Sequence, residues 1–149
     1  MRVARLSDAD AIGELLDSFN REYDDPTPGP SQLAERFRTL LQGGETAVLL
    51  GGDGPDGIAV LRFRPAIWST ALECYLAELY VRPDSRGRGL GRSLMSAVMS
   101  FARTRGADRI ELGTSEDDVA ARALYETFGF TNRERLPDGP VMFFYERDL

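Results

Sequence analysis

The most constraining feature of this sequence is a glycine-rich turn that separates a strand-like segment from an amphipathic helical segment. Residues 73–81 are rich in apolar and aromatic side chains and predict a strand, which Pro83 ends. Residues 90–104 predict a helix, and residues 109–112 predict the next strand. A strand, a helix and a strand in this order predict a right-handed crossover in which the two strands pair in parallel.

The first half of the chain predicts antiparallel pairing. A short edge strand is expected at residues 2–6, and a hairpin is expected to pair residues 46–50 with residues 57–63. Two amphipathic helices lie between the edge strand and the hairpin, and Ser7 and Ser31 can cap their first turns. This half of the chain therefore supplies two helices and three strands.

The last third of the chain predicts one more helix and a final strand. Asp117 or Asp118 opens the helix, which runs through Thr127, and residues 141–145 predict the strand. We therefore expect an α/β fold with a mixed, mostly antiparallel central sheet, one parallel strand pair and helices on both faces. The length predicts a single domain over residues 1–149.

The composition excludes several classes of chemistry. The chain contains no histidine, and all 18 of its basic residues are arginine. A histidine-based triad and a lysine Schiff base are therefore excluded, and we expect no metal site. Cys74 is the single cysteine and has no histidine to activate it, so we expect a buried, unreactive side chain. Trp68 could line an acceptor pocket or cover the core, and of the two we expect it to cover the core.

The charge and hydropathy of the chain limit its partners. A net charge of −6 disfavours nucleic-acid binding, which needs a basic surface. No apolar run reaches the ~20 residues of a membrane span, and the N-terminus lacks the apolar core of a secretion signal. The sequence therefore predicts a cytoplasmic protein with no membrane and no nucleic-acid partner.

The glycine-rich turn predicts an anion site. Gly87, Gly89 and Gly91 let backbone N–H groups converge, and the following helix adds free N–H groups and the positive end of its dipole. Four arginines surround these glycines in a chain that is acidic elsewhere: Arg82, Arg86, Arg88 and Arg92. Such a site is most natural for a pyrophosphate.

The spacing of the glycines separates the candidate ligands. Arg92 stands where the dinucleotide fingerprint G-x-G-x-x-G requires its third glycine, and a chain without lysine has no complete nucleotide-triphosphate loop. Arg86, Gly89 and Gly91 instead match R-x-x-G-x-G. This pattern resembles the acetyl-CoA signature of the GNAT-type N-acetyltransferases.

The resemblance to this family covers almost the whole chain. Residues 75–83 look like the strand that precedes the family's signature, and residues 123–130 (ALYETFGF) look like the end of its late helix. The resemblance implies the GNAT fold, in which the signature strand is splayed from the next parallel strand. Asp118 stands where the family often has Asn, so the role of that Asn is not carried over.

The resemblance also implies how acetyl-CoA binds. Pantetheine is expected to pair with the backbone of Leu79, Tyr80 and Val81. The pyrophosphate is expected on the amides of Arg86, Gly87, Arg88, Gly89, Leu90, Gly91 and Arg92. Acetyl-CoA is then a cosubstrate, and the reaction needs no metal.

The implied reaction is direct attack of a neutral amine on the thioester in a ternary complex. An alkyl ammonium has a pKa near ~10.4, so the site must remove a proton. Glu78 is the first candidate for the base, acting directly or through a water, and Glu111 on the adjacent strand is the second. Tyr125 stands where the family places the general acid that protonates the departing thiolate.

The acceptor is less constrained than the donor. Residues 75–91 are similar to diamine and polyamine acetyltransferases, whereas residues 123–130 and the C-terminus look more like a group that includes aminoglycoside acetyltransferases. We expect a primary amine of a small cationic molecule. A protein or peptide amine, or a CoA-binding regulator without small-molecule turnover, is the alternative. A homodimer through the aromatic run at residues 143–145 is also open.

Overall fold

The computed structural model describes residues 1–135 and 137–149, which divide into two compact units, Met1–Leu112 and Gly113–Leu149. The first unit contains the sheet, the first three helices and the glycine-rich turn. The second unit contains the last helix and the C-terminal segment. No helix in the described part of the chain is long and apolar enough to cross a membrane.

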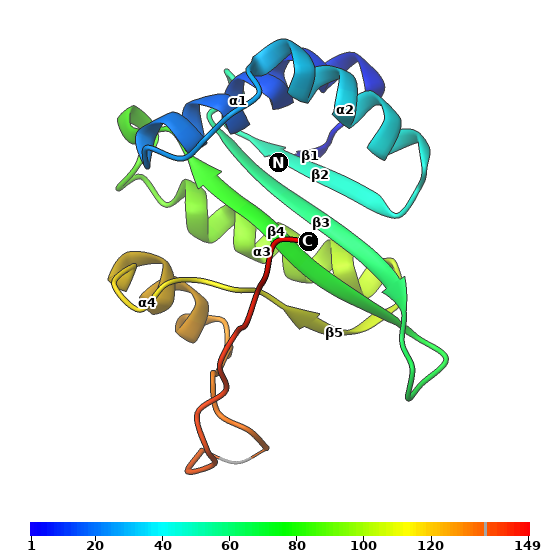
Figure 1. The fold of residues 1–149 in the computed structure, drawn as a ribbon, viewed down its shortest axis with the longest axis vertical. Helices are drawn as coiled ribbons and strands as arrows, with labels where there is room; N and C mark the ends of the chain where they lie inside the picture. Colours follow the sequence, from blue (N-terminus) through cyan, green and yellow to red (C-terminus); the bar gives the residue numbers. More distant parts are fainter. Residues whose placement is uncertain (136) are drawn as a thin grey trace. The chain divides into compact units, whose positions relative to one another are not determined.

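The first unit is built on one five-stranded sheet (Figure 1). Its strands lie in chain order: β1 (Arg2–Val3), β2 (Thr46–Gly51), β3 (Gly57–Pro65), β4 (Leu72–Val81) and β5 (Ala107–Glu111). The first three pairings are antiparallel, and β4 pairs with β5 in parallel. The predicted mixed sheet, with antiparallel pairing early in the chain and one parallel crossover later, is confirmed.

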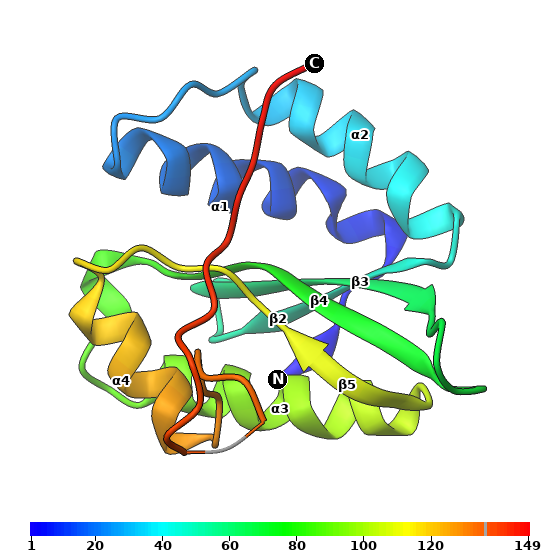
Figure 2. The same ribbon diagram turned by 60° about the horizontal axis from the view of Figure 1, so that its bottom comes forward.

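Helices cover both faces of this sheet, as predicted (Figure 2). Helices α1 (Ala9–Glu22) and α2 (Pro30–Gln42) lie on one face, and α3 (Leu90–Thr104) lies on the other. Burial of an apolar stripe drives this layering, since a sheet face must be covered to remove its side chains from water. The cluster between the sheet and α1 and α2 contains Ile12, Leu15, Leu16, Phe37, Val48, Leu50, Ile58, Val60 and Tyr80.

The first helix starts near Asp8, as predicted, but the N-cap residues of the first two helices are Asp8 and Gly29 and not the expected Ser7 and Ser31. The edge strand ends at Val3, and Leu6–Asp8 then forms a short 3-10 turn. Helix α1 therefore begins at Ala9. Helix α2 begins at Pro30, not after a Ser31 cap. Proline suits the first helical position because that position leaves the backbone N–H unused and the ring fixes a helical φ.

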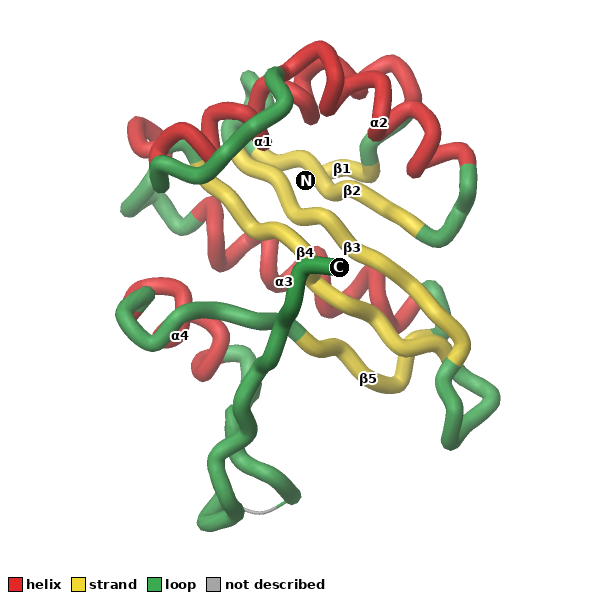
Figure 3. Tube along the Cα trace, viewed as in Figure 1, coloured by secondary structure: helices red, strands yellow, loops and turns green. Residues whose placement is uncertain are grey.

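The second unit forms its helix as predicted but not its strand. Helix α4 spans Val119–Thr127, and the Asp118 carboxylate accepts a hydrogen bond of 3.0 Å from the Ala121 amide. The strand expected at residues 141–145 is absent from the described residues, which are drawn there as loop (Figure 3). Val141 makes one isolated bridge, to Arg133. The segment therefore lacks the continuous partner that a strand requires.

Candidate active site

Strand β4 contains a bulge that decides where its glutamate lies. Val60 on β3 is opposite Glu78, whereas the next residue, Leu61, is opposite Leu76, so Ala77 has no partner. Strand alternation alone would place Glu78 on the same face as Leu76. The extra residue turns Glu78 to the opposite face, where its cross-strand neighbour Val60 packs with α1 and α2.

The Glu78 carboxyl group is half-buried and has no hydrogen-bond or ion-pair partner among the described residues. Burial raises the pKa of Glu78 above its ordinary value, because removal from water penalises the charged form. A carboxylate that is raised in pKa and not committed to an arginine is suited to accept a proton. Glu78 therefore differs from an exposed strand glutamate in both its burial and the direction of its pKa shift.

Strand β4 extends beyond its parallel partner. The β4–β5 pairing runs from Leu72 with Ala107 to Tyr75 with Glu111, and β5 ends there. Residues 76–81 continue along β3 but have no strand on the β5 side within the described sheet. Apart from the Val81 carbonyl, which accepts from the Arg86 Nε, the backbone N–H and C=O groups on that side can pair with an extended ligand, as a peptide pairs with a sheet edge.

The glycine-rich turn follows this free edge. Gly87 and Gly89 adopt φ values of +73° and +80°, which L side chains rarely adopt, and open space lies where a Cβ would stand at either. Gly89 is the residue before α3, and its carbonyl accepts the Ser93 amide at 3.0 Å. The N–H groups of residues 90–92 at the start of α3 therefore lack intrahelical acceptors and can bind an anion.

The arginines around the turn have different surroundings. Arg82 is half-buried, and its Nε is buried without a hydrogen-bond partner among the described residues. Arg88 is exposed and forms no ion pair with any described residue. A buried guanidinium N–H without an acceptor carries a desolvation cost that an anion would relieve. The glycine geometry and the free N–H groups at the start of α3 make the turn itself suitable for an anion such as a pyrophosphate.

The guanidinium of Arg86, in contrast, already donates three hydrogen bonds within the protein. Its two terminal nitrogens donate to the two Glu22 oxygens at 2.6 and 2.9 Å, and its Nε donates to the Val81 carbonyl at 2.9 Å. Glu22, which lies in the last turn of α1, was not predicted as part of the site. One signal was present: an acidic side chain at a helix C-terminus is disfavoured by the helix dipole, so it suggests a compensating partner.

Glu111, the second candidate base, is held in an ion-pair network. One of its oxygens accepts from Arg64 at 2.8 Å, and Arg64 also donates to Glu73 at 2.8 Å. Arg109 approaches Glu111 at 3.9 Å. Glu111 and Glu78 thus differ in environment: the first carboxylate is neutralised by arginine, and the second is not. Of the two carboxylates, that of Glu78 is the one without an arginine partner among the described residues.

The second unit carries the remaining predicted residue. Tyr125 lies in α4, half-buried, with its ring 6.0 Å from that of Phe130. Asp118 caps the same helix through the Ala121 amide. Asp118, which stands where the family often has Asn, therefore serves as the N-cap of α4.

Two other expectations concern the first unit. Cys74 is fully buried, as predicted, and burial raises its pKa to about 11. Trp68 was expected in the core, but it is 95% exposed. It lies at the tip of the β3–β4 loop, between Ala66 and Ala71, whose backbone hydrogen bond of 3.0 Å closes the loop and holds its tip away from the core.

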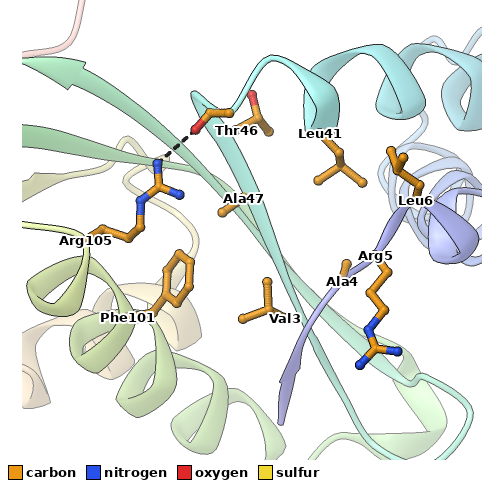
Figure 4. A pocket seen from close by; sticks show the side chains of 10 residues that line it. Val3, Ala4, Arg5, Leu6, Leu41, Thr46, Ala47, Phe101 and Arg105 are labelled. Carbon is orange, nitrogen blue, oxygen red and sulfur yellow. Dashed lines mark hydrogen bonds between the residues drawn. The ribbon is translucent and has the colours of Figure 1, made fainter.

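A cavity of about 300 Å³ lies elsewhere in the first unit, at the edge of β2 (Figure 4). Arg105, which follows α3, reaches across it and donates to the Gly44 carbonyl at 2.9 Å. None of the predicted site residues lines this cavity. Its lining consists of Val3, Ala4, Arg5, Leu6, Leu41, Gly44, Thr46, Ala47, Phe101 and Arg105.

Comparison with known proteins gives a consistent assignment. Residues 11–130 match the model of the acetyltransferase (GNAT) family. YhfO, an uncharacterised N-acetyltransferase of Bacillus subtilis, is 30% identical over 133 residues, which cover 87% of this chain and 88% of YhfO. The aminoglycoside N(6')-acetyltransferase type 1 of Stenotrophomonas maltophilia is 30% identical over 142 residues, covering 91% of this chain and 88% of that protein.

The solved structures agree with these sequence matches. A crystal structure from Arthrobacter sp. FB24, assigned as an acetyltransferase, superposes with a TM-score of 0.91 at 43% identity. The match covers 99% of this chain and 94% of that one. The bulged strand, its free edge and the glycine turn thus occur in a chain that belongs to the acetyltransferase (GNAT) family and is an acetyl-transferring enzyme.

Proposed function

We propose that this protein is an N-acetyltransferase that moves the acetyl group of acetyl-CoA to a primary amine of a small cationic molecule, by direct attack in a ternary complex. The observation that carries the proposal is the Glu78 carboxyl group. It is half-buried, raised in pKa and without a described partner. It also lies on the strand that runs directly into the anion-binding turn.

The turn and the free strand edge would together hold acetyl-CoA. The amides of residues 86–92 would bind the pyrophosphate, and Arg82 would supply the buried donor that lacks an acceptor among the described residues. The backbone of Leu79, Tyr80 and Val81 would pair with the amides of pantetheine along the edge that β5 leaves open. This arrangement would extend the thioester along β4 toward Glu78.

Glu78 would then prepare the nucleophile. An amine attacks a thioester only as the free base, and an alkyl ammonium has a pKa near ~10.4. Glu78 would take the ammonium proton, directly or through one water, and its raised pKa makes it a stronger base than an exposed glutamate. A backbone N–H on the free edge of β4 would stabilise the oxyanion that forms on the carbonyl.

The reaction is completed at the sulfur. A C–N bond forms to the acetyl carbon and the C–S bond breaks, so the coenzyme leaves as a thiolate that needs a proton. We assign that proton to the Tyr125 hydroxyl, whose ordinary pKa of ~10 is close enough to that of a thiol for the transfer. The support for Tyr125 is its place in the segment ALYETFGF, which resembles the family pattern.

The acceptor is proposed to be cationic on two grounds. The chain has a net charge of −6, and Asp24 and Asp25, which follow α1, are both exposed. The Stenotrophomonas relative is by its name an aminoglycoside acetyltransferase. Negative surface charge raises the local concentration of a cationic substrate.

The test is a thiol-release assay with acetyl-CoA and a panel of amines that includes diamines, polyamines, aminoglycosides, amino acids and short peptides. We expect acceptor-dependent release that is fastest with a small polycation. Fastest release with an amino acid or a peptide would overturn the acceptor class. Acetyl-CoA binding without release for any amine would instead support a CoA-binding regulator.

A further inference from the structure

The glycine-rich turn is linked to helix α1 by the side chain of Arg86. Arg86 stands immediately before Gly87 and reaches Glu22, 64 residues earlier in the chain. The Arg86–Glu22 contact is bidentate, at 2.6 and 2.9 Å. The third bond, from Nε to the Val81 carbonyl, ties the same guanidinium to the end of β4. One arginine therefore joins the turn, the strand before it and a helix from the other end of the first unit's sequence.

Aromatic rings surround this contact. The Arg86 guanidinium carbon lies 5.7 Å from the centre of the Tyr80 ring, and Tyr80 is only 4% exposed. The Tyr80 ring stacks on Phe19 with centroids 5.1 Å apart, and Phe19 meets Tyr23 edge to face at 5.4 Å. Because aromatic packing fixes both ends, the ion pair joins two ordered elements.

The electrostatics of the pair agree with this geometry. The Arg86 guanidinium lowers the pKa of Glu22, and Glu22 raises the pKa of Arg86. The Glu22 side chain is 25% exposed and that of Arg86 is 42% exposed, so water screens the pair only in part. Three of the five N–H donors that an arginine carries are thereby used within the protein.

We infer that Glu22 is a positioning residue for coenzyme binding: it holds Arg86 as a strut between α1 and the turn, so that the backbone amides of the turn, and not the Arg86 side chain, bind the pyrophosphate. This inference rests on the proposed binding of acetyl-CoA. It assigns opposite roles to neighbouring arginines, since Arg82 has a buried donor without a described acceptor and the Arg86 Nε is already bonded.

The decisive variant is Glu22→Gln, because the two possible roles of Arg86 predict opposite results. If Arg86 is a strut, loss of its partner loosens the turn, and the Kd for acetyl-CoA rises about 10-fold, as for loss of one charged hydrogen bond. If the Arg86 side chain binds pyrophosphate directly, the same variant frees the guanidinium, and acetyl-CoA binds as tightly or more tightly. That second result would overturn the inference.

Ligand and control variants separate positioning from general destabilisation. S-acetylpantetheine lacks the pyrophosphate, so its KM should be unchanged in Glu22→Gln while the KM for acetyl-CoA rises and kcat is retained. Glu14→Gln removes an exposed glutamate from the same helix and should change neither KM. The double variant Glu22→Gln/Arg86→Gln should bind acetyl-CoA no more weakly than Arg86→Gln alone, because Glu22 acts through Arg86.

Amide hydrogen exchange tests the strut without any ligand. The amides of Ser85 and Arg86 donate to the carbonyls of Arg82 and Pro83 at 2.9 and 3.2 Å, and their exchange should be faster in Glu22→Gln than in the wild type, while exchange in the middle of α3 is unchanged. Equal exchange in the two proteins would overturn the inference, whatever acetyl-CoA does. If the wild type binds no acetyl-CoA but the exchange differs as expected, the proposed function fails and the strut stands. Glu22→Asp, which keeps the charge, should recover part of the protection.

Discussion

Glu78 on β4 lies directly across from Val60 on β3. The pairing of Leu61 with Leu76 would instead put Ala77 opposite Val60, so Glu78 is shifted by one residue. The bulge at Ala77 produces this shift, and it moves a carboxyl group from the face covered by α3 to the face covered by α1 and α2. The chemistry proposed for Glu78 therefore depends on one unpaired residue. Regular alternation through Leu76, Ala77 and Glu78, without the bulge, would leave Glu78 on the α3 face.

Glu78→Gln should lower kcat by about 10²-fold, the usual contribution of a general base. Burial raises the pKa of Glu78, so its basic form accumulates at higher pH than that of an exposed glutamate. The wild-type rate should rise with pH through this raised pKa, and the variant should lose that limb. A pH–rate profile with one good acceptor measures both effects.

The same raised pKa predicts the stability of this variant. A buried acid whose folded pKa lies above its unfolded pKa loses stability as the pH rises and the group ionises. Glu78→Gln should therefore be at least as stable as the wild type at neutral pH, as measured by thermal unfolding. A large fall in Tm would mean that the lost activity reflects damage to the fold.

Glu111→Gln serves as the matched change on the neighbouring strand. Because Arg64 already neutralises Glu111, removal of its charge should change kcat by less than about threefold. If Glu111→Gln lost as much turnover as Glu78→Gln, the result would contradict the assignment of Glu78 and would favour Glu111 on β5 as the base.

Tyr125→Phe should lower kcat by about 10²-fold, because it removes only the hydroxyl that the proposal uses as an acid. The ring contact with Phe130 does not need the hydroxyl, so α4 should stay folded. Isothermal titration should give an unchanged Kd for acetyl-CoA. Turnover close to that of the wild type would exclude Tyr125 as the acid.

Most elements of the fold could be predicted because their signals are local. Proline at 83, the glycines at 87–91 and the apolar spacing of residues 90–104 define the strand, the turn and α3 without reference to the rest of the chain. The prediction of a strand at 141–145 was wrong for the opposite reason: apolar composition favours a strand, but pairing depends on a partner elsewhere in the chain.

The sequence predicted which residues form the candidate site, but not how their side chains are oriented or which distant residues they contact. Glu78 could be named from its strand, yet the bulge at Ala77 has no signature in the sequence, and without it the side chain faces the other way. The Glu22–Arg86 contact joins residues 64 positions apart, which no local pattern reports. The hydrogen bond from Arg64 to Glu111 joins residues 47 positions apart, and no local sequence pattern predicts it either.

Gly89→Ala should weaken acetyl-CoA binding, and Gly106→Ala provides its matched control. The two glycines flank α3 with φ values of +80° and +86°, and neither has an atom within 4 Å of an added Cβ. Each alanine should cost about 1–2 kcal/mol of backbone strain, so the two falls in Tm should be similar. Only Gly89→Ala should raise the Kd for acetyl-CoA, because only that glycine lies in the anion-binding turn.

Equal losses of affinity in the two glycine variants would show that binding follows global stability and not the geometry of the turn. Titration of each variant at a temperature well below its Tm distinguishes the two explanations.

Cys74 should not react with a thiol reagent in the native protein at pH ~8, where an ordinary thiol is partly ionised. It is fully buried, and its pKa of about 11 leaves little thiolate at that pH. Addition of denaturant should release one reactive thiol per chain, since the sequence contains one cysteine. Reaction of the native protein at the rate of a free thiol would show that the β4–α3 interior opens readily.

The open stretch of β4 also has a consequence for the protein before any coenzyme arrives. Residues 76–81 present backbone groups with no strand on the β5 side of the described sheet, and such an edge can template pairing with another chain. A coenzyme that pairs with this edge would satisfy those groups and block that association. Acetyl-CoA would then act as a guard against self-association as well as a reactant.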